Sequence, residues 1–325
     1  MNALLEIKDL KTYFYTTEGV LPAVDGVSFT IGKGETLGIV GESGSGKSVT
    51  ARSVMRLISS PPGRIEGGSI TFNGEDILSK KEQDMQKIRG NKIAMIFQDP
   101  MTSLNPLFTV GDQIMESIIT HQKSTRKEAC DKAIDMLKLV GIPSPEKRIN
   151  DYPHQMSGGM RQRVMIAMAL SCRPDLLIAD EPTTALDVTI QAQILDLIAD
   201  IKDKFNMSVM MITHDLGVVA GVAENVIVMY AGKVMEYGAI GSLFSSPLHP
   251  YTRGLMESIP RLDADEKRLK SIGGTLPNLI ERFNGCRFAP RCSAAKDICS
   301  AKEPPLYRVD GQRVRCFLYS DGGCD

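Results

Sequence analysis

The stretch Gly41-Glu42-Ser43-Gly44-Ser45-Gly46-Lys47-Ser48 decides the fold class of this 325-residue chain. An apolar run at 36–40 precedes it and a helix-compatible segment follows it, which predicts a strand, a loop and a helix in that order. The glycines let the loop turn its N–H groups inward toward an anion, Lys47 can reach the β- and γ-phosphates of a nucleotide, and the Ser48 hydroxyl can bind Mg²⁺. The pattern therefore predicts a nucleoside triphosphate site rather than a flexible glycine-rich turn.

A second pair of motifs lies in the middle of the chain, where Met156-Ser157-Gly158-Gly159-Met160-Arg161-Gln162-Arg163 is followed by Leu176-Leu177-Ile178-Ala179-Asp180-Glu181. The apolar run predicts a strand that places Asp180 at the carboxyl edge of a sheet, where it can hold Mg²⁺, with Glu181 beside it to orient a water molecule. The Ser-Gly-Gly run begins a predicted helix whose first N–H groups can bind another anion. Because the loop at 41–48 does not need this second anion site, we expect another molecule to supply the phosphate.

Together these motifs resemble the ATP-binding-cassette (ABC) ATPases, in which the Ser-Gly-Gly signature of one subunit closes over ATP held by the phosphate loop of its partner. The resemblance runs from about Leu4 to Gly238 and includes Ala185-Leu186-Asp187 after the paired carboxylates. The signature has Met156 and Met160 where the commoner form has Leu and Gln, but its Ser-Gly-Gly centre is intact. The resemblance implies a head-to-tail dimer that sandwiches two ATP molecules.

Further residues acquire roles through this resemblance. Gln98 follows the apolar run at 93–97, and His214 follows the run at 209–213. In the resembled family the glutamine couples the nucleotide to the transport partner and the histidine senses the γ-phosphate. The aspartate that corresponds to Asp187 contacts the opposing subunit.

The resemblance also implies an aromatic residue that stacks on adenine. Phe14 corresponds best to this position, although Tyr13 and Tyr15 flank it and any of the three could be an ordinary strand aromatic. The predicted catalytic residues are Glu181, His214 and Gln98, and the predicted magnesium ligands are Ser48, Gln98 and Asp180. The predicted ATP-binding residues are Phe14, Gly41, Ser43, Gly44, Ser45, Gly46, Lys47, Ser48, Val49, Ser157, Gly158, Gly159 and Asp187.

Composition agrees with an enzyme subunit that does not cross a membrane. The chain has 24% charged and 42% hydrophobic residues and a net formal charge of −1, which does not indicate a nucleic-acid partner. It contains no run of 18 apolar residues, and its start lacks a basic segment followed by a long apolar one. We therefore expect a cytoplasmic protein, which the resemblance implies is bound to the cytoplasmic face of the cell membrane.

The pattern of apolar runs predicts an α/β fold with a P-loop nucleotidase core. Short strand-like runs occupy 4–10, 27–31 and 36–40, and strongly apolar runs at 93–97, 176–180 and 209–213 indicate buried parallel strands. A capping box at Thr125–Glu128 begins a predicted helix. The resemblance adds an antiparallel β subdomain and an inserted helical subdomain at about 100–160, where the segment 99–106 would lie near the groove for a permease. We predict an ATPase domain at 1–240 and a short, irregular, cysteine-rich domain at 241–325.

The carboxyl-terminal region holds an array of widely spaced cysteines, namely Cys286, Cys292, Cys299 and Cys316. Disulfides are disfavoured in the cytoplasm, so four thiolates in this array suggest a soft metal site, with Cys324 outside it. An iron–sulfur cluster, a tetrahedral zinc and unligated cysteines remain alternatives, and the wide gaps favour the bulkier [4Fe-4S] cluster over Zn²⁺. Arginines that would offset the negative charge of either site are Arg282, Arg287, Arg291, Arg313 and Arg315. Cys130 and Cys172 lie in helix-like surroundings and are predicted to pack as small hydrophobic residues.

This tail also resembles the carboxyl-terminal extension of the oligopeptide and dipeptide transporter ATPases, because His249-Pro250-Tyr251-Thr252 is followed by Asn284-Gly285-Cys286. Some members of that subfamily are associated with a cysteine-bound iron–sulfur cluster. The resemblance implies the ATPase subunit of a peptide importer. Its partners would be a second ATPase subunit, identical or paralogous, two integral membrane permease subunits and, indirectly, a peptide-binding protein outside the cell membrane.

Other functions remain open from the sequence. The importer could carry another small solute, such as nickel or an oligosaccharide. A non-transport ABC protein could act on ribosomes, DNA or iron–sulfur assembly, although this chain has one cassette and no sustained heptads. An electron-transfer protein built around the tail is a further alternative, which the complete ATP-site pattern disfavours.

Overall fold

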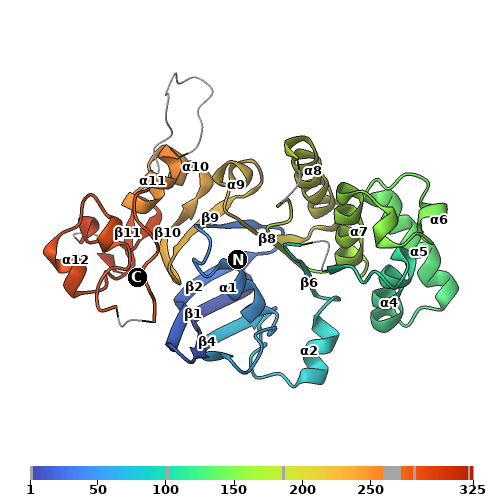
Figure 1. Cartoon of the computed structure of the whole chain (residues 1–325), viewed down its shortest axis with the longest axis horizontal. Helices are drawn as coiled ribbons and strands as arrows, with labels where there is room; N and C mark the ends of the chain where they lie inside the picture. The colour runs from blue at the N-terminus through green and yellow to red at the C-terminus, as the bar shows by residue number, and fades with distance from the viewer. Residues whose placement is uncertain are drawn as a thin grey trace. The chain divides into compact units, whose positions relative to one another are not determined.

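The computed structural model describes residues 3–99, 103–184, 187–258, 272–280, 283–320 and 323–324. The chain forms two compact units (Figure 1). Unit 1 comprises residues 1–31, 36–78 and 213–325, and unit 2 comprises 32–35 and 79–212. Of the residues singled out above, Pro100, Met101, Thr102, Ala185, Leu186 and Arg282 lie outside the described residues.

Unit 1 contains the antiparallel β subdomain. Its strand order is β2 (Gly19–Gly32), β1 (Ala3–Thr16), β4 (Gly63–Phe72) and β5 (Glu75–Asp76). β1 extends beyond the predicted run at 4–10, because its pairing with β4 resumes after an irregularity between Lys8 and Lys11. The predicted antiparallel subdomain is therefore confirmed.

A second, mixed sheet in unit 1 carries the phosphate loop. β3 (Thr36–Val40) is buried at every position and runs parallel to β9 (Asn225–Tyr230), as an apolar run without alternation predicts. The loop then leads into α1 (Lys47–Val54). Strands from the carboxyl-terminal region extend the same sheet in the order β10 (Lys233–Ala239), β12 (Gln312–Val314), β11 (Tyr307–Val309) and β13 (Gly323–Cys324). The sequence did not predict this extension.

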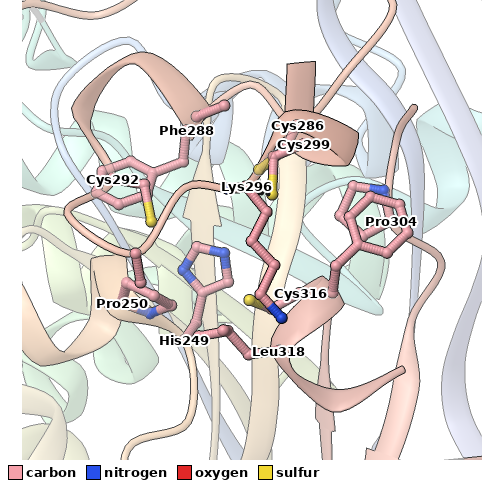
Figure 2. A pocket seen from close by; sticks show the side chains of 13 residues that line it. His249, Pro250, Cys286, Phe288, Cys292, Lys296, Cys299, Pro304, Cys316 and Leu318 are labelled. Atoms are coloured by element: carbon pink, nitrogen blue, oxygen red, sulfur yellow. Dashed lines mark hydrogen bonds between the residues drawn. The ribbon is translucent and has the colours of Figure 1, made fainter. Parts of the chain in front are cut away.

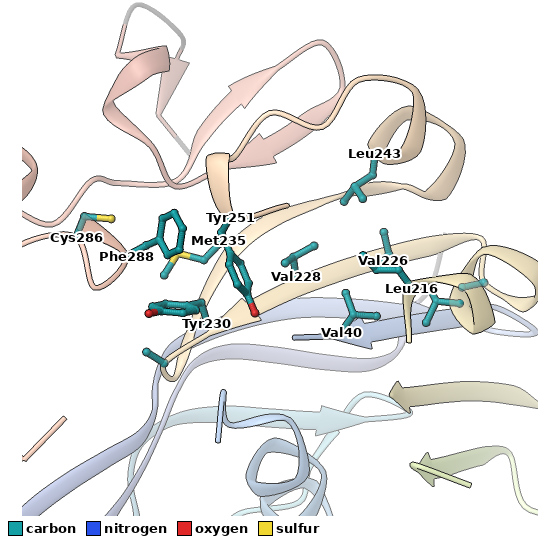
Figure 3. Packing of buried hydrophobic residues seen from close by; sticks show 13 residues of the cluster. Val40, Leu216, Val226, Val228, Tyr230, Met235, Leu243, Tyr251, Cys286 and Phe288 are labelled. Carbon is teal, nitrogen blue, oxygen red and sulfur yellow. The ribbon is translucent and has the colours of Figure 1, made fainter. Parts of the chain in front are cut away.

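The remaining carboxyl-terminal elements are short, as the closely spaced prolines lead one to expect. They are α9 (Leu216–Val222), α10 (Ile240–Ser245), α11 (Pro250–Glu257), η2 (Ala289–Arg291), α12 (Asp297–Ala301) and η3 (Phe317–Tyr319). All but η3 pack on the mixed sheet through an aromatic cluster (Figure 3). η3 packs against a separate cluster that contains Tyr307 and Val314. The ring centroid of Tyr230 lies 4.8 Å from that of Tyr251 and 5.2 Å from that of Phe288. Val40, at the end of β3, belongs to the same cluster, so this region shares its core with the base of the phosphate loop.

Unit 2 contains the three other predicted parallel strands, β6 (Ile93–Ile96), β7 (Leu176–Asp180) and β8 (Ser208–Thr213), which are buried at every position. Its helices are α2 (Glu82–Ile88), α4 (Val110–Gln122), α5 (Arg126–Leu139), α6 (Pro145–Arg148), η1 (Pro153–Gln155), α7 (Gly158–Leu170) and α8 (Val188–Phe205). Helices α4, α5 and α7 pack against one another, and Cys172 is buried with its Sγ 3.6 Å from Ser117 Oγ. Cys130, on α5, is half-buried. Among the helices in the described residues, none combines the length and apolar character that a bilayer crossing needs.

The capping box predicted from the sequence is present at the start of α5. Thr125 Oγ1 accepts a hydrogen bond from the Glu128 N–H at 3.3 Å, and the Glu128 carboxylate accepts one from the Thr125 N–H at 2.8 Å. Thr125→Ala should lower the free energy of unfolding by about 1 kcal/mol, because an orphan N–H loses its acceptor. Thr125→Ser should retain most of the stability in the same denaturant titration. Equal losses in the two variants would contradict the capping role.

Candidate functional site

The phosphate loop has a backbone that requires glycine at its two ends. Gly41 has φ +152° and Gly46 has φ +100°, values that side-chain-bearing residues rarely adopt. A β-carbon at Gly41 would lie 2.1 Å from the Met229 carbonyl oxygen, and one at Gly46 would lie 2.4 Å from the Ala23 carbonyl oxygen. The glycines therefore allow two neighbouring backbone segments to approach closely and fix the curve of the loop.

Lys47 lies inside this curve and is 4% exposed. Its Nζ donates hydrogen bonds to the carbonyl oxygens of Gly41 at 2.7 Å and Glu42 at 3.0 Å. The ammonium group is thus already held among the oxygens of the loop, at the place where phosphate oxygens would be recognised. Ser48 is the second residue of α1 and is half-buried. Of the other predicted loop residues, Ser43 and Gly44 are exposed, Ser45 is buried and Val49 is half-buried.

Unit 2 brings three of the predicted residues together at the carboxyl ends of its parallel strands. Asp180 ends β7 and is 2% exposed, and Glu181 follows it with φ +49°. Gln98 Nε2 donates to Glu181 Oε2 at 2.8 Å. Thr184 Oγ1 donates to the same oxygen at 2.9 Å, a contact that sequence reasoning missed. Two donors on one carboxylate oxygen hold the Glu181 side chain in a defined orientation.

The signature motif of unit 2 begins α7. Ser157 is the N-cap residue, and its Oγ accepts a hydrogen bond from the Met160 N–H at 3.3 Å. Ser157 and Gly158 are exposed, and no heavy atom outside the helix lies within 4 Å of a β-carbon placed on Gly158. The first turn holds no acidic residue. This helix end is therefore open toward solvent and electrostatically suited to an anion.

Two other predicted residues, Asp187 and His214, lie at the ends of regular elements. Asp187 is the N-cap of α8, where its carboxylate accepts a hydrogen bond from the Ile190 N–H at 2.9 Å. Asp187 thus has a helix-capping role whatever else it contacts. His214 follows β8 directly and is exposed.

The three candidate aromatics for adenine all lie on β1. The Tyr13 hydroxyl donates to Asp25 at 2.9 Å and the Tyr15 hydroxyl donates to Glu66 at 2.8 Å. Burial and the bond to Asp25 raise the pKa of Tyr13 to about 12. Because side chains alternate along a strand, Phe14 lies on the opposite face from the two tyrosines.

The four carboxyl-terminal cysteines line one cavity together with His249 (Figure 2). Cys286 and Cys316 are each 9% exposed, and all four cavity cysteines are free thiols. Burial, with a smaller contribution from the neighbouring thiols of Cys299 and Cys316, raises the pKa of the Cys286 thiol to about 11. Within the described ranges, no three side chains of the metal-binding types are arranged around a single ion position.

Comparisons with known proteins place these features in a family. Residues 24–184 match the family described as ABC transporter, and residues 235–299 match the one described as oligopeptide/dipeptide transporter, C-terminal region. The oligopeptide transport ATP-binding protein AppD of Bacillus subtilis is 54% identical over 100% of this chain and 99% of its own length. The oligopeptide transport ATP-binding protein OppD of Salmonella typhimurium is 53% identical over 97% of this chain and 94% of its own.

This chain belongs to the ATP-binding subunits of the oligopeptide and dipeptide ABC transporters. It is therefore an ABC ATPase. A solved dimeric structure of the ATP-binding cassette MJ0796 bound to ADP and Pi is similar with a TM-score of 0.66 and 27% identity, covering 73% of this chain and 98% of that one. The fold expected from the sequence, an ABC-type P-loop core with an antiparallel β subdomain, is confirmed.

The glycine geometry of this ABC ATPase gives a sharp test. Gly46→Ala should lower the free energy of unfolding by about 1–3 kcal/mol and weaken MgATP binding, because a β-carbon meets the Ala23 carbonyl in a strained backbone conformation. Gly221→Ala is the control, since its β-carbon would meet no atom within 4 Å and Gly221, on α9, is outside the predicted ATP-site residues. Thermal unfolding and equilibrium nucleotide binding measure both variants. Similar losses in the two would contradict the steric argument.

Proposed function

We propose that this ABC ATPase powers a peptide importer from the cytoplasmic face of the cell membrane. The observation that carries this function is the continuous match of the chain to peptide-transport ATPases such as AppD, across both the cassette and the carboxyl-terminal region. We assign residues 1–240 to the ATPase domain, with a helical subdomain at about 100–160. Residues 241–325 form the cysteine-rich extension.

Each residue of the ATP site has a separate role in hydrolysis. Lys47 neutralises phosphate charge from within the glycine loop, and the loop N–H groups bind the phosphate oxygens. Ser48, Gln98 and Asp180 would hold Mg²⁺, which would supply electrostatic stabilisation of the transferring phosphoryl group. Glu181, oriented by Gln98, positions and deprotonates the attacking water. Phe14 stacks on adenine and His214 contacts the γ-phosphate.

Each ATP site is completed by a second ATPase subunit. The N-terminal turn of α7, from the exposed Ser157 and Gly158 to the half-buried Gly159, binds the phosphates of ATP held on the partner, and Asp187 faces the dimer interface. The dimeric assembly of the similar cassette MJ0796 supports this arrangement. Closure of the dimer drives two permease subunits through the helical subdomain. A peptide-binding protein delivers the solute, so the solute need not touch this chain.

We further propose that the cysteine cavity holds a [4Fe-4S] cluster. The four thiols of Cys286, Cys292, Cys299 and Cys316 converge although the sequence spaces them widely. A tetrahedral zinc needs its four sulfurs about 3.8 Å apart, since each Zn–S bond is about 2.3 Å. The wide spacing of the four cysteines along the chain favours the bulkier cluster, which uses one thiol per iron, over a single zinc ion. The cluster would offset the cost of burying thiolates among apolar side chains.

The role of Glu181 is tested by Glu181→Gln. The amide keeps the shape and the contacts of the side chain but cannot accept a proton, so hydrolysis should fall at least about tenfold while ATP binding persists. Steady-state phosphate release and equilibrium ATP binding measure the two properties. A variant that retains more than about a tenth of the wild-type turnover would remove Glu181 from the catalytic role.

The shared site is tested by comparing Lys47→Ala with Ser157→Arg. Lys47→Ala should lose ATP binding to the isolated chain, because the loop loses its cation. Ser157→Arg should keep that binding and lose ATP-dependent dimerisation, because its side chain would obstruct the open helix end. Calorimetry and size-exclusion chromatography separate these defects. Loss of monomer ATP binding in Ser157→Arg would contradict the composite site.

Anaerobic purification tests the cysteine site. The protein should be brown, with broad absorbance near roughly 400 nm and with bound iron and sulfide. Replacing any of the four cavity cysteines by Ser should bleach the colour while the remote phosphate loop still binds ATP, and Cys130→Ser, on α5, should leave the colour unchanged. Colourless protein with stoichiometric zinc would replace the cluster by Zn²⁺, and colourless protein without any metal would remove the site.

A further inference from the structure

The phosphate loop contains an acidic residue at its second position. Glu42 has 27% of its side chain exposed and follows Gly41 directly. A carboxylate in a loop that binds a triphosphate opposes that binding through like-charge repulsion unless a cation compensates it. Lys47 Nζ donates to the Glu42 carbonyl oxygen, and the carboxylate of Glu42 has a cationic partner of its own.

The carboxyl-terminal region supplies that cation. Arg291, in η2, forms a two-pronged ion pair with Glu42, with Nη1 2.8 Å from Oε2 and Nη2 3.0 Å from Oε1. The two residues are 249 positions apart in the sequence. Only 6% of the Arg291 side chain is exposed. A fork-to-fork arginine–carboxylate pair fixes geometry as well as charge, which a lysine at the same place would not do.

Arg291 is itself held rigidly. Its Nε donates to the Gly273 carbonyl oxygen at 2.8 Å, and Nη2 donates to that of Ile272 at 3.2 Å. Its guanidinium carbon lies 5.6 Å from the ring centroid of Tyr230 and 6.0 Å from that of Phe288, within the range of cation–π attraction. The orientation of the fork is therefore set before any nucleotide arrives.

The backbone of Glu42 is held by the same region. The Glu42 N–H donates to the Tyr251 hydroxyl at 2.9 Å, and Tyr251 is fully buried. In addition, the Leu276 side chain lies 3.4 Å from a β-carbon placed on Gly44. Two separate carboxyl-terminal segments thus contact the phosphate loop, one at the carboxylate of Glu42 and one at its N–H, and a third places Leu276 beside Gly44.

We propose that Arg291 is a positioning residue of the ATP site: by pairing with Glu42 it neutralises the acidic residue of the phosphate loop and fixes the loop in the curve that receives the triphosphate. The proposal rests on the assignment of residues 41–48 as the ATP site. It makes the segment between the first two cavity cysteines a part of the nucleotide site. Binding of ATP then depends on the carboxyl-terminal region even though none of its residues needs to touch the nucleotide.

Arg291→Gln in the full-length protein tests the proposal. The variant leaves the Glu42 charge uncompensated, so the Kd for MgATP should rise about tenfold or more, and the rise should shrink at high salt, where unpaired charges are screened. The double variant Arg291→Gln with Glu42→Gln should recover most of the affinity, because the repelling charge is gone. Arg291→Lys should fall between the wild type and Arg291→Gln, since it keeps the charge and loses the fork.

Arg315→Gln is the matched control. Arg315 also precedes a cavity cysteine and pairs with an acid, since its Nη1 lies 3.1 Å from Glu303 Oε1. Its guanidinium also donates to the carbonyl oxygens of Pro304 and Val234, which lie outside the phosphate loop. It should leave the Kd for MgATP near the wild-type value. If Arg315→Gln weakens binding as much as Arg291→Gln, the effect comes from general disruption of the tail and the proposal is wrong.

Further outcomes would overturn the proposal or its premise. An unchanged Kd in folded Arg291→Gln, or a double variant as weak as the single one, overturns the proposal. Should Arg291→Gln fail to fold, Glu42→Gln alone tests the same charge, because it should bind MgATP at least as tightly as the wild type, and a tenfold loss would overturn the idea. Lys47→Ala tests the assignment of the ATP site separately from the role of Arg291. Normal MgATP binding in this variant would refute the assignment of residues 41–48 as the ATP site.

Discussion

The close approach of two backbone carbonyls to the phosphate loop is the constraint on which the ATP site depends. The Met229 carbonyl lies where a side chain on Gly41 would be, and the Ala23 carbonyl lies where one on Gly46 would be. Met229 comes from β9, the parallel neighbour of β3. The curve of the loop, and with it the position of Lys47, is therefore fixed by two neighbours of the loop as well as by the loop itself. These neighbours are β9, which pairs with β3, and the Ala23 carbonyl on β2.

The strand that confines the loop also anchors the carboxyl-terminal region. Tyr230 follows Met229 on β9 and packs edge-on against Phe288, whose ring centroid also lies 5.3 Å from that of Tyr251. Phe288 lines the cysteine cavity as well as this aromatic cluster (Figures 2 and 3). One aromatic core thus lies between the cysteines and the phosphate loop. The carboxyl-terminal region is therefore part of the structure that holds the nucleotide loop.

In unit 2, parallel pairing concentrates polar chemistry at one edge. The in-register strands β6 and β7 end near Gln98 and Glu181, and this juxtaposition produces the hydrogen bond between them. Glu181 adopts a positive φ, which costs about 1–3 kcal/mol for a residue with a side chain. Its N–H bond to the Ile212 carbonyl at 2.8 Å and its contact with Thr184 help to maintain that conformation. Strain at this position is a feature expected of a functional carboxylate.

The sequence alone identified the phosphate loop, the buried parallel strands and the capping box at Thr125, because each depends on neighbouring residues and on local periodicity. It also marked the four cysteines, but only the tertiary structure places them on one cavity. The pairing of Arg291 with Glu42 and the addition of β11 and β12 to the sheet could not be predicted, since they join segments far apart in the chain. Spacing along a chain determines which local element a residue enters. Which distant charge or strand edge that element meets is decided by the packing of a shared core, and that packing exists only in the folded protein.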